Sequence, residues 1–132
     1  MVRRLAVMVG AALLFSAGAM RLIGRLGRDW EARVAVRGHS MDPTLLDGDW
    51  LLVDPSAFEH RPPRDGELVV ARDPRAPGRT LVKRARQTHQ GLALGSDHPA
   101  HADDDIGPVS QSDLLGRPWF RYWPRRRIGP VH

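Results

Sequence analysis

The stretch RGHSMDPTLLDGDWLLVD, residues Arg37–Asp54, joins a turn-forming segment to a short apolar run. Ser40 lies three residues before Pro43, and Gly48 stands between two aspartates just before the apolar run. Proline and glycine with acidic neighbours are typical of tight turns, and an apolar run bounded by turn signals is typical of a buried strand. The stretch therefore predicts a serine on a rigid corner that leads into a strand. Such a serine is either a loop residue or a nucleophile.

Strand patterns recur on both sides of this stretch. Turn-rich loops at 60–67 and 74–78 and an acidic loop at 97–108 separate them. Short strands at this spacing, with glycine and proline between them, predict a mainly β fold. The expected strands cover residues 31–38, 49–54, 68–73, 79–87, 90–96 and 113–124.

Composition narrows the class of protein. A length of 132 residues favours one domain, and 42% hydrophobic with 27% charged residues argues against disorder. The chain has no cysteine, which excludes a disulfide scaffold and a cysteine nucleophile. The net charge of +5 comes almost entirely from arginine, and Lys83 is the only lysine. The arginines do not alternate with aromatic residues along a face, so the pattern does not indicate nucleic-acid binding.

The N-terminal segment carries an apolar run, Leu5–Met20, without a charged residue. Counted to Gly24, its length is close to what a membrane-spanning helix needs, if Arg21 reaches the interface. We favour a retained membrane anchor over a cleaved signal peptide or a buried helix. Arginines on both flanks leave its orientation open. The expected division is an anchor at 1–30, a peptidase domain at 31–124 and a basic tail at 125–132.

Ser40 needs a base before it can act as a nucleophile. Six histidines are present, but nothing around Ser40 resembles a nucleophile elbow. A neutral lysine is the other route, and Lys83 would share the apolar face of its strand with Leu81 and Ala85. A plain ion pair of Lys83 with a carboxylate is the alternative that the residues leave open.

Three blocks of the sequence resemble the type I signal peptidases, the serine–lysine membrane proteases. They are GHSMDPTLLDGDWLLVD, RDGELVVARDP with RTLVKRA, and GSDHPAHADDDIGPVSQSDLLGRPWFRYWP, in the family's order over Val34–Pro124. The short form is most similar to maturation proteases of nickel superoxide dismutase and to the mitochondrial inner-membrane protease. Only about a dozen positions join Lys83 to Gly95, too few for the extra domain of large signal peptidases.

The resemblance implies a compact β-barrel-like protease domain behind one N-terminal membrane-anchor helix. It implies that Ser40 is the nucleophile and Lys83 the general base, with the Ser40 N–H as an oxyanion donor. Gly38 occupies a position where some members carry a hydroxyl donor, and Met41 would pack beside the cleavage site. Structural roles are implied for Pro43, Thr44, Asp47, Gly48, Asp49 and Arg84.

One block departs from the family pattern. The family has Asp-Ser-Arg where this chain has Asp103–Asp105, and the serine of that motif helps to orient the lysine. An aspartate beside Lys83 would favour the charged amine and oppose its role as a base. Three outcomes are open: the aspartates face solvent, Ser96 supplies the hydroxyl, or activity is reduced.

The sequence thus favours a membrane-bound serine endopeptidase that removes signal or pro-peptides, with its catalytic domain on the outer face of a bacterial cell membrane. Its expected partners are precursor proteins and the lipid membrane, with no nucleic acid. No cofactor or metal is expected, because His98 and His101 beside Asp97 and Asp103 fit an ordinary surface loop. The alternatives are a self-cleaving regulator with the same dyad and an inactive, membrane-tethered peptide-binding β module.

Overall fold

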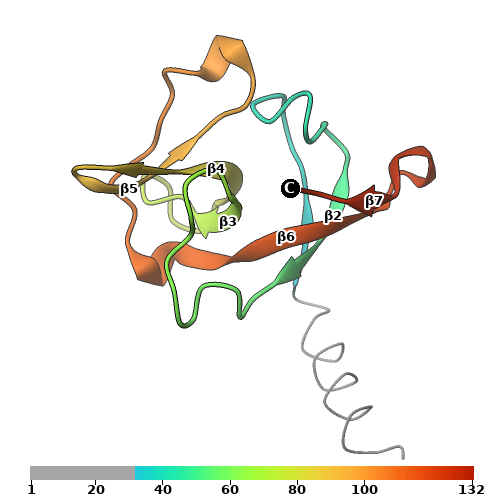
Figure 1. Cartoon of the computed structure of the whole chain (residues 1–132). Coiled ribbons are helices and arrows are strands. Elements are labelled where there is room, and N and C mark those ends of the chain that lie inside the picture. The colour runs from blue at the N-terminus through green and yellow to red at the C-terminus, as the bar shows by residue number, and fades with distance from the viewer. Residues whose placement is uncertain (1–31) are drawn as a thin grey trace, which may run out of the picture. The chain divides into compact units, whose positions relative to one another are not determined.

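The computed structural model describes residues 32–132 (Figure 1). The predicted anchor lies outside the described residues. Within 32–132, no helix has the length and apolar character needed to cross a bilayer. The described elements are β1 (Arg33–Ala35), β2 (Trp50–Asp54), β3 (Leu68–Arg72), β4 (Thr80–Thr88), β5 (Gly91–Gly95), η1 (Pro99–His101), η2 (Gln111–Asp113), β6 (Leu114–Trp123), η3 (Arg125–Arg127) and β7 (Gly129–Pro130).

The strands form one antiparallel sheet in the order β1-β2-β6-β3-β4-β5, with β7 on β6. The mainly β fold predicted from the strand patterns is confirmed, and each expected strand overlaps an observed one. The long strand β6 joins the two parts of the sheet, because its first residues pair with β3 and its later residues pair with β2 and β7. At the crossing, Gly116 has φ +153°, and a Cβ there would lie 2.5 Å from the Asp54 carbonyl oxygen. The close approach of β6 to β2 therefore needs a glycine.

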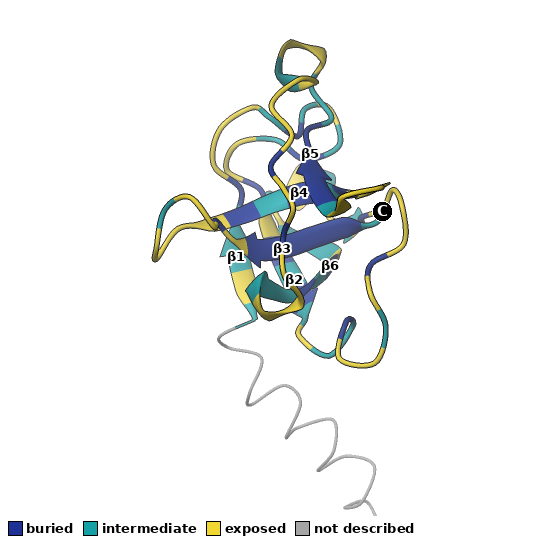
Figure 2. Cartoon of the chain, turned by 90° about the vertical axis from the view of Figure 1, so that its left-hand side faces the viewer, coloured by how far each residue is buried: buried dark blue, intermediate teal, exposed yellow. Residues whose placement is uncertain are grey.

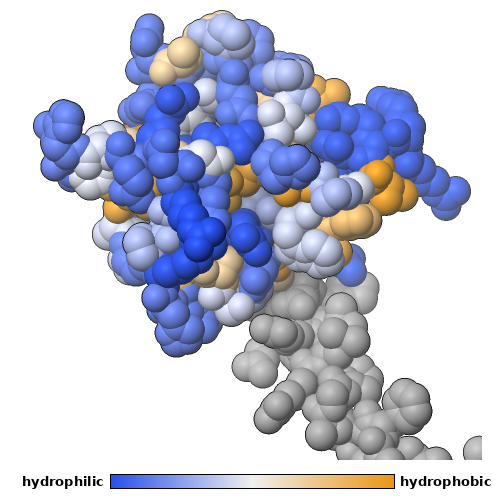
Figure 3. All heavy atoms as spheres, in the orientation of Figure 1, coloured by the Kyte–Doolittle hydropathy of each residue, from blue (hydrophilic) through white to orange (hydrophobic). Residues whose placement is uncertain are grey.

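Two apolar clusters fill the fold. The first packs against β3, β4 and β5, and the second lies under the turn that carries Ser40. Strand β3 is buried over most of its length, as its dark ribbon in Figure 2 shows. Hydrophilic side chains cover much of the face drawn in Figure 3, over β3–β5. The first cluster consists of Phe58, Val69, Ala71, Leu81, Ala85, Leu94, Ile106 and Val109, and the second of Val36, Met41, Leu45, Leu51, Leu68 and Val131.

Two strand edges that flank Ser40 and Lys83 have no paired neighbour within residues 32–132. Val36 exchanges backbone hydrogen bonds with the segment before β2, so Ala35 and Arg37 turn their backbone groups the other way. In β4, every second residue bonds to β3, and the backbone groups of Thr80 and Val82 between them point away from β3. Pairing with β5 begins only at Arg84. The extension of β1 and the first half of β4 thus each present an unpaired edge.

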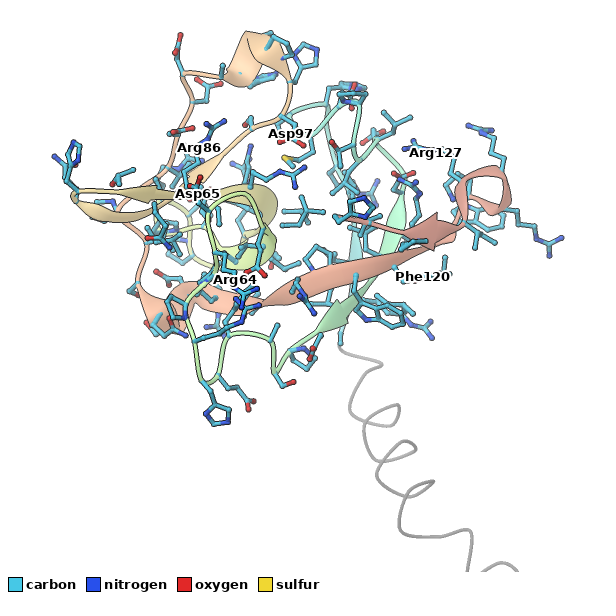
Figure 4. The ribbon with its side chains drawn as sticks, viewed as in Figure 1. Arg64, Asp65, Arg86, Asp97, Phe120 and Arg127 are labelled. Carbon is cyan, nitrogen blue, oxygen red and sulfur yellow. The ribbon has the colours of Figure 1, made fainter. Side chains whose placement is uncertain are left out.

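The C-terminal residues take part in the fold. Residues 125–132, which we predicted as a basic tail, contain η3 and β7, and Val131 belongs to the second apolar cluster. Of the residues in η3, Arg127, labelled in Figure 4, reaches Asp49 just after the turn that carries Ser40. The division into anchor, peptidase domain and tail stays a prediction.

Candidate active site

Ser40 opens a tight turn that reaches Thr44. The Leu45 N–H donates to the Met41 carbonyl at 2.9 Å, which closes the turn. Met41 and Leu45 are 2% and 0% exposed and insert into the second apolar cluster. Burying these two side chains holds the turn on the core, while Ser40 itself remains partly exposed.

The segment that follows the turn fixes the backbone of residues 36–38, which lead into the turn. Gly38 has φ +80°, a conformation that side-chain-bearing residues rarely adopt, and its N–H donates to Asp47 Oδ1 at 2.8 Å. The Gly48 N–H donates to the Val36 carbonyl at 2.9 Å. Since Asp47 already accepts the Gly38 N–H, Gly38 contributes backbone geometry, and its place in an oxyanion or substrate-binding site stays a prediction.

Asp49 ties the turn to the C-terminal strands. Its carboxylate is 1% exposed and accepts the Leu46 N–H at 2.9 Å. The same carboxylate lies 3.1 Å from Arg121 Nη1 and 3.4 Å from Arg127 Nη2. Arg121 also donates to the Thr44 carbonyl at 3.2 Å, so β6 and η3 hold the C-terminal end of the turn and the segment that follows it. A buried charge needs such compensation, and here two guanidiniums supply it.

Lys83 sits on the inner face of β4, between Leu81 and Ala85, as the alternating pattern predicts. It is 9% exposed, and its Nζ donates to Ser96 Oγ at 2.9 Å. Burial lowers the pKa of Lys83 below its ordinary value, and the charges of Arg75 and Arg79 lower it further, against a smaller opposing effect of the aspartates 104 and 105. The environment therefore raises the share of the uncharged amine above that of an ordinary lysine, and the uncharged amine is the form that can accept a proton.

The segment Ser96–His98 connects the two sides of the site. The Ser96 hydroxyl contacts Lys83, and the His98 N–H donates to the Ser40 carbonyl at 3.0 Å. Asp97, labelled in Figure 4, accepts from Thr44 Oγ1 at 2.7 Å and from Arg84 Nη2 at 2.6 Å. Burial raises the pKa of Asp97, but the hydrogen bonds from Arg84 and Thr44 outweigh burial and leave that pKa below its usual value.

Two cavities meet at this point, and Ser40 and Lys83 line both of them. The smaller has a volume of about 150 Å³ and lies between the two unpaired edges, β1 with its extension and the first half of β4. The larger, of about 490 Å³, opens toward the loop after η1. The structure thus brings the predicted serine and lysine, from opposite parts of the sheet, to one cleft.

The acidic loop has a defined place beside this cleft. Asp104 and Asp105 line the larger cavity, where Asp104 is 3.0 Å from His101 and Asp105 is 3.6 Å from Arg86. Ser96, one of the three outcomes considered from the sequence, provides the hydroxyl that contacts Lys83. The aspartates therefore act on Lys83 only across the cavity.

The remaining structural residues fall where they can support the turn. Thr44 and Arg84 meet on Asp97, and Pro43 lies within the turn. Arg121 and Arg127 were not anticipated from the sequence, because their partner Asp49 lies more than 70 positions away in the chain. Their one available signal was the placement of arginines around an aromatic strand, which does not identify a partner.

A family model described as Peptidase S24-like matches residues 30–117, more than half of the chain. The chain belongs to this family. The mitochondrial ATP-independent inner membrane protease subunit 1b of Arabidopsis thaliana is similar to it, with 28% identity in an alignment of 120 positions that covers 71% of each protein. The resemblance to signal-peptidase-like proteases drawn from the three sequence blocks is confirmed. As a Peptidase S24-like protein, the chain has a peptidase-type function.

Proposed function

We propose that this protein is a membrane-bound serine endopeptidase that uses Ser40 and Lys83 as a catalytic dyad to remove signal or pro-peptides. The observation that carries the proposal is the shared cleft. Ser40 and the buried Lys83 line the same two cavities, and the lysine is the only amine side chain in the sequence. A serine requires a base to become a nucleophile, and an amine with a lowered pKa is such a base.

The first chemical step is attack on the substrate. Neutral Lys83 takes the proton of the Ser40 hydroxyl, and Ser40 Oγ bonds to the carbonyl carbon of the scissile peptide. Negative charge develops on the carbonyl oxygen, where the Ser40 N–H is the proposed donor. One donor of this kind contributes about 3 kcal/mol.

The second step releases the products. Protonated Lys83 gives its proton to the leaving amine as the C–N bond breaks, which leaves an ester on Ser40. Water then attacks the ester carbon while Lys83 takes a proton from the water. As the ester bond breaks, Lys83 returns this proton to the Ser40 oxygen, which restores the serine and frees the acid product. The Ser96 hydroxyl holds the Lys83 amine in place through both steps.

Substrate binding is proposed to occur along the unpaired edges. Ala35 and Arg37 on one side, and Thr80 and Val82 on the other, present free backbone groups to the smaller cavity. An extended peptide can add to such an edge as a further strand, which is a common mode of peptide recognition. This arrangement would place its backbone beside Ser40.

Membrane attachment is proposed from the apolar run Leu5–Met20, with the catalytic domain on the outer face of a bacterial cell membrane. The similar Arabidopsis protein is named as an inner membrane protease. Precursor proteins delivered to the same membrane are the natural substrates for such an enzyme.

The test uses the full chain in detergent micelles and a fluorogenic peptide with Ala-x-Ala before the cut. We expect Ser40→Ala and Lys83→Arg each to lower kcat on the order of 10⁴-fold or more, because arginine keeps the charge but cannot act as a base. Ser110→Ala, an exposed serine outside the cleft, is the matched control. Turnover should rise with pH through the Lys83 pKa, which lies below the ordinary lysine value.

The outcomes separate the competing functions. Unchanged turnover in either site variant rejects the dyad. Cleavage of the chain itself at a rate independent of protein concentration, without peptide turnover, would favour a self-cleaving regulator. Peptide binding without any cleavage would favour the inactive peptide-binding module.

A further inference from the structure

The smaller cavity is rich in positively charged side chains. Three arginines, Arg37, Arg75 and Arg79, line it together with Ser40 and Lys83, and no acidic residue does. Its remaining walls are mainly apolar, from Ala35, Val36, Met41, Leu81 and Val82. A volume of about 150 Å³ is comparable to that of a cavity that holds one benzene-sized group. The cavity therefore suits a single side chain with an apolar stem and a negative end.

The hairpin between β3 and β4 is built to hold two of these arginines at the cavity. Asp73 is buried, and it accepts hydrogen bonds from Arg75 Nε at 3.0 Å and from Arg75 Nη2 at 3.1 Å. Arg79 Nε lies 3.7 Å from Asp73 Oδ2, the oxygen that also accepts the Arg75 Nη2 hydrogen bond. The Asp73 backbone also bonds to residues 76 and 79, which closes the hairpin. One carboxylate thus holds two guanidiniums and leaves an excess positive charge.

Arg37 adds a second positive charge from the opposite edge. Its side chain is exposed, and within residues 32–132 no carboxylate lies in ion-pair contact with it. Arg37 lies between the unpaired edge of β1 and Ser40, where it would stand over the backbone of a bound peptide. Guanidiniums bind carboxylates well, because their N–H groups match the two oxygens.

The two sides of the cleft differ in charge. The larger cavity is lined by the same arginines but also by Asp104 and Asp105, whereas the charged residues that line the smaller cavity are all arginine or lysine. A carboxylate in the larger cavity would face these aspartates, and one in the smaller cavity would not. The difference selects the side on which an acidic residue can sit.

We propose that the smaller cavity is a subsite for an acidic side chain, so that the enzyme prefers precursors with Asp or Glu next to the scissile bond. The proposal rests on the proposed function and names its substrate class. The arginines would neutralise the substrate carboxylate, which otherwise would favour protonated Lys83 and oppose its role as a base. Arg37, Arg75 and Arg79 are on this view specificity-determining residues.

The test compares peptides that carry Glu or Gln at each of the three positions on either side of the cut. Binding is measured by fluorescence polarisation to the full-length Ser40→Ala protein in micelles, and kcat/KM is measured with the active protein. At one position, we expect Glu to be preferred over Gln by about tenfold at low salt, with the preference falling as salt is added.

Arg37 is the residue to vary, because replacing Arg75 or Arg79 would leave the buried Asp73 poorly compensated. Arg37→Gln should abolish the preference for Glu, and Arg37→Glu should reverse it toward Lys at the same position. Arg64→Gln is the charge-matched control, since Arg64 lies in the loop before β3 (Figure 4) and lines neither cavity.

The two proposals fail separately. Equal binding of Glu and Gln peptides at every position, no measurable binding of any Glu peptide, or a preference that survives both Arg37 variants overturns the acidic subsite. Ser40-dependent turnover without a Glu preference leaves the dyad standing and removes the subsite. A Glu preference in binding that is lost in Arg37→Gln, with no turnover of any peptide, supports the subsite and removes the dyad.

Discussion

The two residues of the proposed dyad are carried by different kinds of structure. Lys83 belongs to a nine-residue strand whose inner face packs on the first apolar cluster. Ser40 belongs to a turn held by two buried side chains, Met41 and Leu45, and by contacts from distant parts of the chain. A strand ladder fixes the direction of each side chain by its alternation, whereas a turn has no repeating pattern and needs individual supports.

This difference determines how each side of the site should respond to change. A substitution in the lysine half removes packing but leaves the hydrogen-bond ladder between β3, β4 and β5 in place. A substitution in the serine half removes one of a few contacts that hold the turn. We therefore expect equal losses of stability in the two halves to produce unequal losses of turnover.

The largest effect on stability is expected from Asp49→Asn. The change leaves Arg121 and Arg127 without their shared negative partner at a site where the carboxylate is 1% exposed. Removing one member of a buried ion pair costs about 3–5 kcal/mol. Urea unfolding of the full chain in micelles measures the loss, and turnover should fall as well.

Asp103→Asn is the control for this change, because Asp103 is an exposed acid outside these contacts. Its free energy of unfolding should stay within about 0.5 kcal/mol of the parent value. A similarly small loss in Asp49→Asn would show that the turn does not depend on the two arginines.

A matched leucine pair compares the two halves directly. Leu45 supports the turn and Leu94 lies in β5, and each is 0% exposed in its own cluster. Replacing either with alanine should lower the free energy of unfolding by about 3 kcal/mol. Measured where both variants are folded, turnover should fall further in Leu45→Ala. Equal turnover in the two would break the contrast between turn and strand.

The same contrast explains what the sequence could predict. Alternation in TLVKRARQ was enough to place Lys83 on the inner face beside Leu81 and Ala85. The turn signals around Pro43 and Gly48 located the corner that carries Ser40. Ser96 was foreseen only as one of three outcomes, because its contact with Lys83 depends on how β5 pairs with β4.

The long-range supports of the turn could not be predicted. Arg121 shares its partner Asp49 with Arg127, and nothing local in the sequence marks either arginine for that role. The arginines of the smaller cavity are a similar case, since they come from the β1 extension and from the β3–β4 hairpin. Which side chains line a cleft between two sheet edges depends on how the sheet curves, and strand patterns do not specify that curvature.

The smallest effect is expected from Asp97→Asn, at a carboxylate that touches both halves. Its contacts with Thr44 and Arg84 are hydrogen bonds of a partly buried charged group, so the loss should be about 1–2 kcal/mol at neutral pH. Because the folded protein has a lowered Asp97 pKa, this stabilisation is present above the ordinary carboxyl pKa of about 4 and is lost as pH falls through the folded value. The difference in unfolding free energy between parent and variant should therefore be constant from pH 7 to 5 and should shrink toward pH 3. A difference that stays constant down to pH 3 would assign the loss to packing. A loss of turnover larger than that in Leu94→Ala would show that the contacts of Asp97 with Thr44 and Arg84 align the serine turn with the lysine strand.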